Sequence, residues 1–208
     1  MKIKRVYALC YLVFLLAFTS CECAVEIRAR EDGEQEFALQ LELGKLVLEA
    51  ANSIAQFSPS DGALFDTEAI KAQLERSRFK DVAVSSASPS QLTLMATGSL
   101  SALVSQTGTS LRVTLSPRSL AQAASLFPEE ERAVFDLLMA PVFTGEPMTS
   151  EEYRELLALV YGNEFADEAA RAAISFRLLS PKGKAKHFRL LLLDLLTLTG
   201  QRTLSIDF

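Results

Sequence analysis

Residues 24–43, AVEIRAREDGEQEFALQLEL, alternate apolar and polar side chains on both sides of a central Asp32-Gly33 pair. Alternation with a period of two places the apolar members of a strand on one face and the polar members on the other. An Asp-Gly pair supplies the positive φ angle that a tight turn between antiparallel strands requires. The stretch therefore predicts a β-hairpin with one buried face and one solvated face.

Beyond the hairpin, extended and helical patterns follow each other without a repeat or a Pro-rich linker, so we expect one domain at residues 21–208. We predict an α+β fold, in which a mostly antiparallel sheet is built from N-terminal and C-terminal hairpins and about five helices pack on it. The C-terminal hairpin is expected around Pro181-Lys182-Gly183, which has the composition of a type II turn. Further strands are expected at residues 82–84, 91–96, 111–115, 174–178 and 203–208, and helices at residues 45–57, 67–77, 117–124, 128–139 and 149–161.

Three of these helices have clear start signals. Asp66 is placed to accept hydrogen bonds from the amides of the first turn. Ser116-Pro117 combines a capping residue with a proline at the first helical position. Thr149 and Glu152 have the spacing of a capping box, in which each side chain bonds to the backbone of the other.

Two segments are ambiguous. Residues 100–104 are expected to form a short helix, and residues 188–198 are apolar on both faces, which suits a buried strand or a buried helix. The neighbouring turns favour a strand for the second segment. Asp194 interrupts its apolar residues, and a buried carboxylate is costly unless it is paired. We expect Asp194 to pair with Arg177, Arg189 or Arg202, or to lie at an exposed position of the strand.

The N-terminus has a different character. Lys2, Lys4 and Arg5 precede an apolar run at residues 6–18. A basic start, a short apolar run and small residues before a cut site are the parts of a secretory signal. A membrane-spanning helix needs about 20 apolar residues. The run is therefore predicted to be an export signal.

Phe18-Thr19-Ser20-Cys21 ends this run and resembles a bacterial lipobox, in which small residues precede a cysteine that is acylated. Phe18 departs from the strict pattern, which prefers an aliphatic residue, and is similar to the loose form of spirochaete lipoproteins. The resemblance implies a signal peptide at residues 1–20 and lipidation of Cys21, which would hold the exported domain by its acyl chains, such as palmitate, to the periplasmic or outer-envelope face of a bacterial membrane. The alternative is that Cys21 closes an ordinary signal or a short hydrophobic tail.

The three cysteines leave no pair for a disulfide within the exported chain. Cys10 would be removed with the signal and Cys21 would carry the lipid, which leaves Cys23 as a thiol in a tether beside the membrane, or as one that pairs between chains. A domain of about 190 residues can be stable from its core alone. One histidine and one remaining cysteine also do not match the ligand set of a zinc site, so we expect no metal and no cofactor.

The charge balance excludes one class of partner. The chain has 21 Lys and Arg and 26 Asp and Glu residues, and because three of the basic residues lie in the predicted signal, the exported part has 18 against 26, a net charge of −8. Nucleic-acid binding requires a basic face that displaces counterions from phosphates. We therefore expect no nucleic-acid partner, and we expect membrane attachment to depend on the acyl chains.

The chain offers little catalytic chemistry. His187 is the single histidine, and no Gly-x-Ser-x-Gly or other nucleophile motif accompanies it. A phosphate-binding glycine loop is also missing. The acidic pairs at residues 129–131 and 151–152 stand where helix starts favour negative charge. We therefore predict no catalytic residues, and we interpret His187 as a surface side chain.

Lys182, Lys184, Lys186 and Arg189 form a basic segment around His187 that runs against the acidic background. One interpretation is a contact with lipid head groups or another anionic partner. The other is a solvated hairpin tip whose lysines discourage pairing at the sheet edge, which is the commoner role of such a run.

Two functions are consistent with these observations. The first is a non-catalytic binding or scaffold role in the envelope, with a lipid, another apolar ligand or an envelope protein as partner. The alternative is an envelope hydrolase that uses carboxylates brought together by the fold, since such pairs are not visible in sequence. A cleft with two acids of raised pKa would favour the enzyme, and an enclosed apolar cavity would favour the lipid binder.

Overall fold

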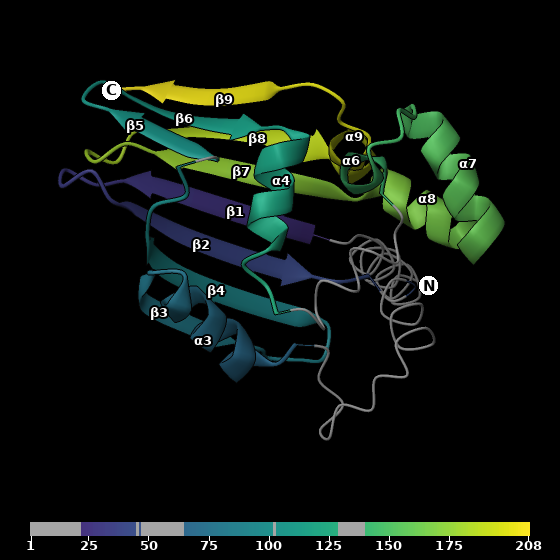
Figure 1. The fold of residues 1–208 in the computed structure, drawn as a ribbon, viewed down its shortest axis with the longest axis horizontal. Helices are drawn as coiled ribbons and strands as arrows, with labels where there is room; N and C mark the ends of the chain where they lie inside the picture. The colour runs from purple at the N-terminus through teal and green to yellow at the C-terminus, as the bar shows by residue number, and fades with distance from the viewer. Residues whose placement is uncertain (1–21, 45, 47–64, 102, 129–139) are drawn as a thin grey trace, which may run out of the picture.

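The computed structural model describes residues 22–44, 46, 65–101, 103–128 and 140–208. These residues form an α+β fold with a six-stranded, mostly antiparallel sheet, a second sheet of three strands and six helices (Figure 1). The predicted class is therefore confirmed at this level. The structure adds the division of the strands between two sheets, which the sequence pattern did not indicate.

The large sheet is centred on the predicted N-terminal hairpin. Its strand order is β3-β4-β2-β1-β7-β8. β1 pairs with β2 in antiparallel orientation and, along its other edge, with β7 in parallel orientation, so the N-terminal and C-terminal hairpins lie side by side. The strands are β1 (Glu22–Ala29), β2 (Gln35–Glu42), β3 (Lys80–Ser85), β4 (Gln91–Gly98), β7 (Ala173–Leu179) and β8 (Ala185–Leu191).

Both hairpins close with the same turn. The amide of Gly33 donates to the carbonyl of Arg30 at 3.3 Å, and the amide of Gly183 donates to the carbonyl of Ser180 at 3.0 Å. In each turn the positive φ angle falls on the glycine, at 87° for Gly33 and 83° for Gly183. A type II turn would place it on Lys182, so that prediction is wrong. The turn is a three-residue loop that ends in a left-handed glycine.

The small sheet lies over the half of the large sheet that contains β1, β7 and β8 (Figure 1). It has the order β5-β6-β9. Ile27 of β1 and Leu178 of β7 are fully buried against its inner face, which contributes Val113 and Ile206. Its strands are β5 (Val104–Thr107), β6 (Ser110–Leu115) and β9 (Arg202–Asp207).

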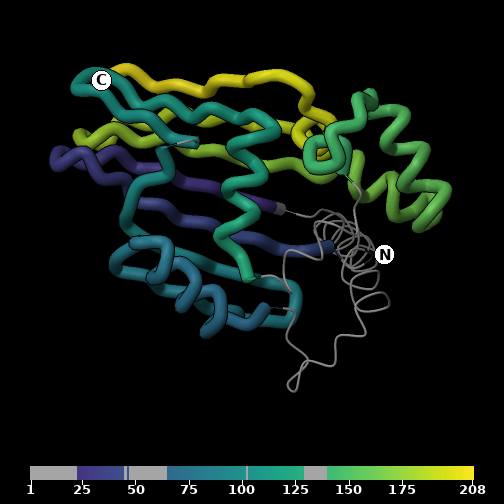
Figure 2. Tube along the Cα trace, viewed as in Figure 1, coloured from purple at the N-terminus to yellow at the C-terminus, as the bar shows by residue number. Residues whose placement is uncertain are grey.

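Six helices complete the described chain. α3 packs on β3 and β4, where Ile70 and Leu74 are buried against Leu92. α4 crosses the same side of the large sheet, and the remaining four gather at the end where β1 begins (Figures 1 and 2). The helices are α3 (Thr67–Arg76), α4 (Pro117–Ala124), α6 (Pro141–Thr144), α7 (Ser150–Tyr161), α8 (Asn163–Arg171) and α9 (Leu192–Leu196).

The structure corrects several local predictions. The expected helix at residues 100–104 is a turn in which the amide of Val104 donates to the carbonyl of Leu100, and it leads into β5. Residues 188–198 are not one strand: β8 ends at Leu191 and α9 begins at Leu192. The segment between the helices expected at residues 128–139 and 149–161 contains α6, and α8 was not predicted either. The predicted helices at residues 45–57 and 128–139 lie largely outside the described residues.

The large sheet has one side with no helix or strand over it among the described residues. Antiparallel sheets tolerate such a solvated face, because their side chains alternate between the two sides. Strand registers align one exposed residue from each strand in a row across this open face. The row consists of Ser85, Thr93, Gln40, Ala24, Ser175 and Arg189.

Candidate functional site

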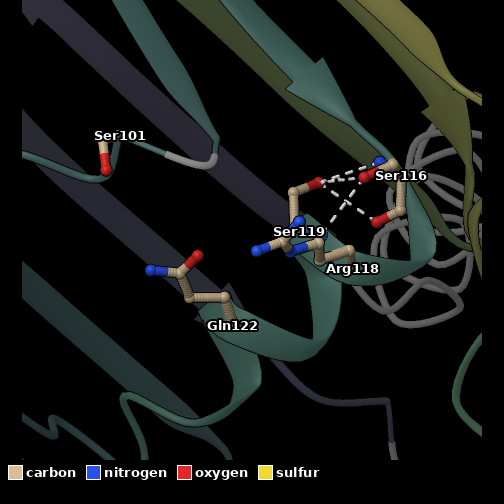
Figure 3. Close-up of a pocket in the computed structure, with 5 residues that line it drawn as sticks. All are labelled: Ser101, Ser116, Arg118, Ser119 and Gln122. Carbon is tan, nitrogen blue, oxygen red and sulfur yellow. Dashed lines mark hydrogen bonds between the residues drawn. The ribbon is translucent and has the colours of Figure 1, made fainter.

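A hollow of about 510 Å³ lies at the start of α4. It is lined by Ser101, Ser116, Arg118, Ser119 and Gln122 (Figure 3). Ser119 is almost fully buried, whereas Arg118 and Gln122 are exposed. Its lining is polar and includes no carboxylate, histidine or cysteine.

Ser116 and Ser119 of this hollow form hydrogen bonds at the start of α4. The amide of Ser116 donates to Ser119 Oγ at 2.8 Å, and the amide of Ser119 donates to Ser116 Oγ at 3.2 Å. Ser119 Oγ also donates to the carbonyl of Thr114 at 2.8 Å. Pro117 has no amide donor at the first helical position. These bonds form the capping box of α4, and they leave neither serine hydroxyl placed as a nucleophile.

The sequence did not predict this hollow, although Ser116-Pro117 was recognised as a helix start. Ser119 could have indicated the capping box, because a serine three residues after a capping serine can take the place of the usual Glu or Gln. The residues that line the hollow from outside the helix, such as Ser101, are brought there by the fold.

The structure divides the predicted basic segment between β8, an edge strand of the large sheet, and the turn that precedes it. Lys184 Nζ donates to the carbonyl of Asp207 in β9 at 2.6 Å. Lys186 Nζ lies 5.1 Å from the ring centroid of Phe188, within the range of a cation–π contact. Lys182 is exposed in the turn itself.

Arg189 points to the open face instead, because side chains alternate along a strand. It is paired across the sheet with Ser175, and the neighbouring pair on the same face is His187 and Arg177. Arg177 in turn donates to Glu26 at 3.0 Å. The four basic residues of the predicted contact therefore do not form a single patch.

His187 is exposed on β8, as expected for a surface side chain. Its partner across the strand pair is Arg177, a cation, and within the described residues no hydroxyl or carboxylate bonds to its ring. A hydroxyl–histidine–carboxylate arrangement needs bonds on both ring nitrogens. The geometry around His187 therefore gives no catalytic triad in the described part of the chain.

Asp194 is neither buried nor paired with an arginine. It is exposed in α9, and its Oδ1 accepts a hydrogen bond from Ser150 Oγ at 2.9 Å. Ser150 opens α7, so the bond links two helices at the end of the sheet. The proposed pairing with Arg177, Arg189 or Arg202 is wrong, because the change from strand to helix at Leu192 turns Asp194 toward α7.

The shifted pKa values of charged groups have local structural causes. The hydrogen bond and charge of Glu34, 2.6 Å away, raise the pKa of Lys80. Asp167, at 2.5 Å, raises the pKa of Arg154 and ties α8 to α7. Hydrogen bonds from Thr149 lower the pKa of Glu152. The first two pairs join separate elements, the third caps the start of α7, and none of these groups lines the hollow.

Two tyrosines of α7 have raised pKa values for another reason. Burial raises the pKa of Tyr153, which is fully buried between α7, α8 and their neighbours. Burial also raises the pKa of Tyr161, which is only partly buried. Tyr161 lies against Phe165, with ring centroids 4.8 Å apart. These phenols belong to the apolar core of the helical end.

Cys23 lies in β1, where it is half-buried between Leu41 of β2 and Ile174 of β7. The expectation of a thiol in a tether is therefore wrong, since the ordered strand has already begun at Glu22. Cys21, the predicted lipidation site, lies outside the described residues.

Residues 22–44, 65–101, 103–128 and 140–208 contain no group of three or more His, Cys, Asp or Glu side chains that could hold a metal ion. The helices within the same ranges are all too short or too polar to cross a membrane. No family model, curated protein or solved structure matches this chain.

Proposed function

We propose that the chain is a lipoprotein of the bacterial envelope, held by an acylated Cys21, whose domain has a non-catalytic binding or scaffold role. One observation carries the proposal: Glu22, the residue that follows the cysteine, already pairs with β2 and β7. The lipobox resemblance rests on residues 18–21, whereas the place of Glu22 in the sheet rests on its pairing with Glu42 and Ala173. Acylation of Cys21 would therefore put the membrane anchor directly beside the sheet.

The chemistry of the described residues supports a binding role. Acids that the fold brings close to other charged groups are bonded to cations, as in Glu26 with Arg177 and Asp167 with Arg154. General acid catalysis by a carboxylate requires a raised pKa, which such cations oppose. The hollow beside Ser119 is polar, so it offers no enclosed site for a lipid tail.

The short connection to Cys21 also affects the basic segment. β7 starts beside Glu22 and runs for seven residues to the turn that contains Lys182. At about 3.3 Å per residue, this turn lies roughly 20 Å from the anchored end. An anionic contact of Lys182 would therefore involve a soluble or protein partner, and not the head groups of the membrane that holds Cys21.

Anchoring is tested by replacing single cysteines in the full chain. Cys21→Ala is expected to lose labelled palmitate and to leave the detergent phase, because the acyl chains provide the membrane affinity. Cys23→Ala, two residues later, is the matched control and is expected to keep both properties. Equal labelling of the Cys21→Ala protein and the native protein would contradict the proposal.

The binding role is tested on the acylated protein after gentle extraction from its host. Native mass spectrometry is expected to detect a stoichiometric envelope component that stays associated. The matching assay is hydrolysis of envelope polymers by the same preparation. Turnover of such a polymer, lost in carboxylate variants, would replace the proposed role with that of an enzyme.

A further inference from the structure

The corner between α7 and α8 carries two consecutive exposed apolar side chains, and the described residues expose two more large ones, Met95 in β4 and Leu191 in β8. Leu159 is 84% exposed and Val160 is 48% exposed, and they are consecutive in the last turn of α7. The opposite side of the same helix is core, because Tyr153 and Leu157 are almost fully buried. Leu159 therefore projects from the fold and Val160 is about half exposed, so a partner that covers them would remove apolar surface from water.

This corner lies at the end of the molecule where the chain leaves toward Cys21. α8 runs from the corner to Arg171, and Ala173, two residues later, pairs with Glu22 at the start of β1. A helix of nine residues spans about 14 Å. Figures 1 and 2 show α7 and α8 extending beyond the end of the sheet on this side.

A third exposed apolar side chain lies at the same end. Leu191, the last residue of β8, is 39% exposed and is the strand partner of Ala173. The opposite end of the sheet carries the charged turns that contain Asp32 and Lys182. This end thus holds three of the four exposed large apolar side chains among the described residues, together with the carboxylates of α7 and α8.

We propose that the α7–α8 corner rests in the interfacial layer of the bilayer that holds Cys21, with Leu159 and Val160 inserted among the lipids. The inference rests on the proposed anchoring. Two side chains of this size bury too little apolar surface to recruit a free protein to a membrane. A covalent anchor one residue from β1 keeps the corner at high local concentration near the surface, so that a weak contact becomes populated.

The charges around the corner indicate which lipid surface it suits. Glu155 is one turn before Leu159, and Glu164 is in the first turn of α8. These carboxylates would be repelled by anionic lipids and attract no phosphate. The contact is therefore apolar, and zwitterionic phosphatidylcholine is the appropriate probe surface.

The chain contains no tryptophan, so a single introduced indole reports its own environment. The experiment uses the full acylated protein in phosphatidylcholine vesicles, with Leu159→Trp as the probe and Lys182→Trp as the matched control at the opposite end. We expect the emission of Leu159→Trp to move to shorter wavelength and to be lost when the lipids carry bromine in their acyl chains. The emission of Lys182→Trp is expected to stay unchanged. Val160→Trp serves as a second probe.

Three results would overturn the inference. If the protein is acylated and bound to vesicles but Leu159→Trp and Val160→Trp are not quenched by brominated lipid, the corner lies in water and only the anchoring proposal stands. A shift to shorter wavelength without quenching would mean that another protein copy or partner covers the corner. A protein without an acyl chain on Cys21 would remove the anchoring proposal and this inference together.

Discussion

Gly98 shows how one residue can be fixed by its neighbour across a sheet. It ends β4, and a Cβ atom added there would lie 2.6 Å from a ring carbon of Phe79. Phe79 is buried and packs edge-on against Phe37, with ring centroids 5.8 Å apart. The ring has little room to move, because it is held on both sides.

Gly98→Ala is therefore expected to destabilise the domain by about 1–3 kcal/mol, as for other substitutions that add volume to a filled core. The free energy of unfolding in urea, measured on both variants, checks this. Gly108→Ala is the matched control, since nothing lies within 4 Å of a Cβ atom at that turn position. A loss of the same size in Gly108→Ala would point to the backbone and not to the Phe79 ring.

Single residues also show where sequence information ends. The alternation around Ile27 correctly predicted a buried position, because burial follows from a local period of two. Gly98 looked like any other glycine, and nothing in its vicinity along the chain indicated Phe79 as its neighbour. The solvated face of the hairpin was predicted in the same way, but the alternation did not indicate which strands would extend this face across the sheet.

Helix starts were the most predictable elements, since their bonds join residues three positions apart. Asp66 Oδ1 accepts from the amide of Ala69 at 2.9 Å, as the sequence indicated for α3. The capping box of α7 is confirmed too, with Glu152 Oε2 accepting from the amide of Thr149 at 2.8 Å. The prediction of a strand at residues 188–198 was wrong, because an apolar run fits a buried strand and a buried helix equally well. The packing of α9 against α6, α7 and α8 decides between the two.

The capping box of α7 leads to a pH-dependent stability. Hydrogen bonds from Thr149 lower the pKa of Glu152 in the folded state, so the contribution of Glu152 is complete above the ordinary pKa of a glutamate and is lost as the pH falls through the lowered value. Glu152→Ala is expected to be slightly less stable than the native protein at neutral pH. The two are expected to converge in acid, as measured by thermal unfolding across a pH series.

Glu155→Ala provides the comparison for this experiment. Glu155 lies on the same exposed helix, one turn further from the start, and has no bond to the backbone of Thr149. Its variant should follow the native pH profile. A pH-independent difference between Glu152→Ala and the native protein would show that Glu152 acts through helix propensity and not through its charge.

At the scale of the whole molecule, the decisive feature is the parallel contact between β1 and β7. The sequence predicted an N-terminal hairpin and a C-terminal hairpin, and both exist. Their adjacency rests on pairs such as Glu22 with Ala173, which are far apart in the chain and have no local signature. The second sheet could not be predicted for the same reason, because its central strand β6 pairs with β9 near the C-terminus.

The short connection between Cys21 and β1 makes a further prediction about the whole molecule. A flexible Gly-Ser segment of about 12 residues has a reach of roughly 20 Å. Inserted between Cys21 and Glu22, it should leave acylation unchanged and weaken the quenching of Leu159→Trp by brominated lipid, because the domain can then move away from the surface.

The same segment inserted at Gly108, in the turn between β5 and β6, is the control for this change. That turn lies with the charged turns at the opposite end of the sheet (Figure 1). The insertion at Gly108 should leave the quenching of Leu159→Trp unchanged. Undiminished quenching in the Cys21–Glu22 insertion would show that Leu159 and Val160 bind the bilayer without help from the short connection.

The pairing of β1 also sets the order in which the chain can assemble. β1 is synthesised before the other described strands, but one of its edges pairs with β7. In this pairing Glu22 lies opposite Ala173, so β1 cannot complete its hydrogen bonds until β7 has been made. Contacts between such distant segments form slowly, because the chain loses the entropy of closing a long loop before the contacts can stabilise it. The six-stranded sheet therefore stays incomplete until most of the chain has been made, which is compatible with the proposed export, since a secreted chain crosses the membrane before it folds.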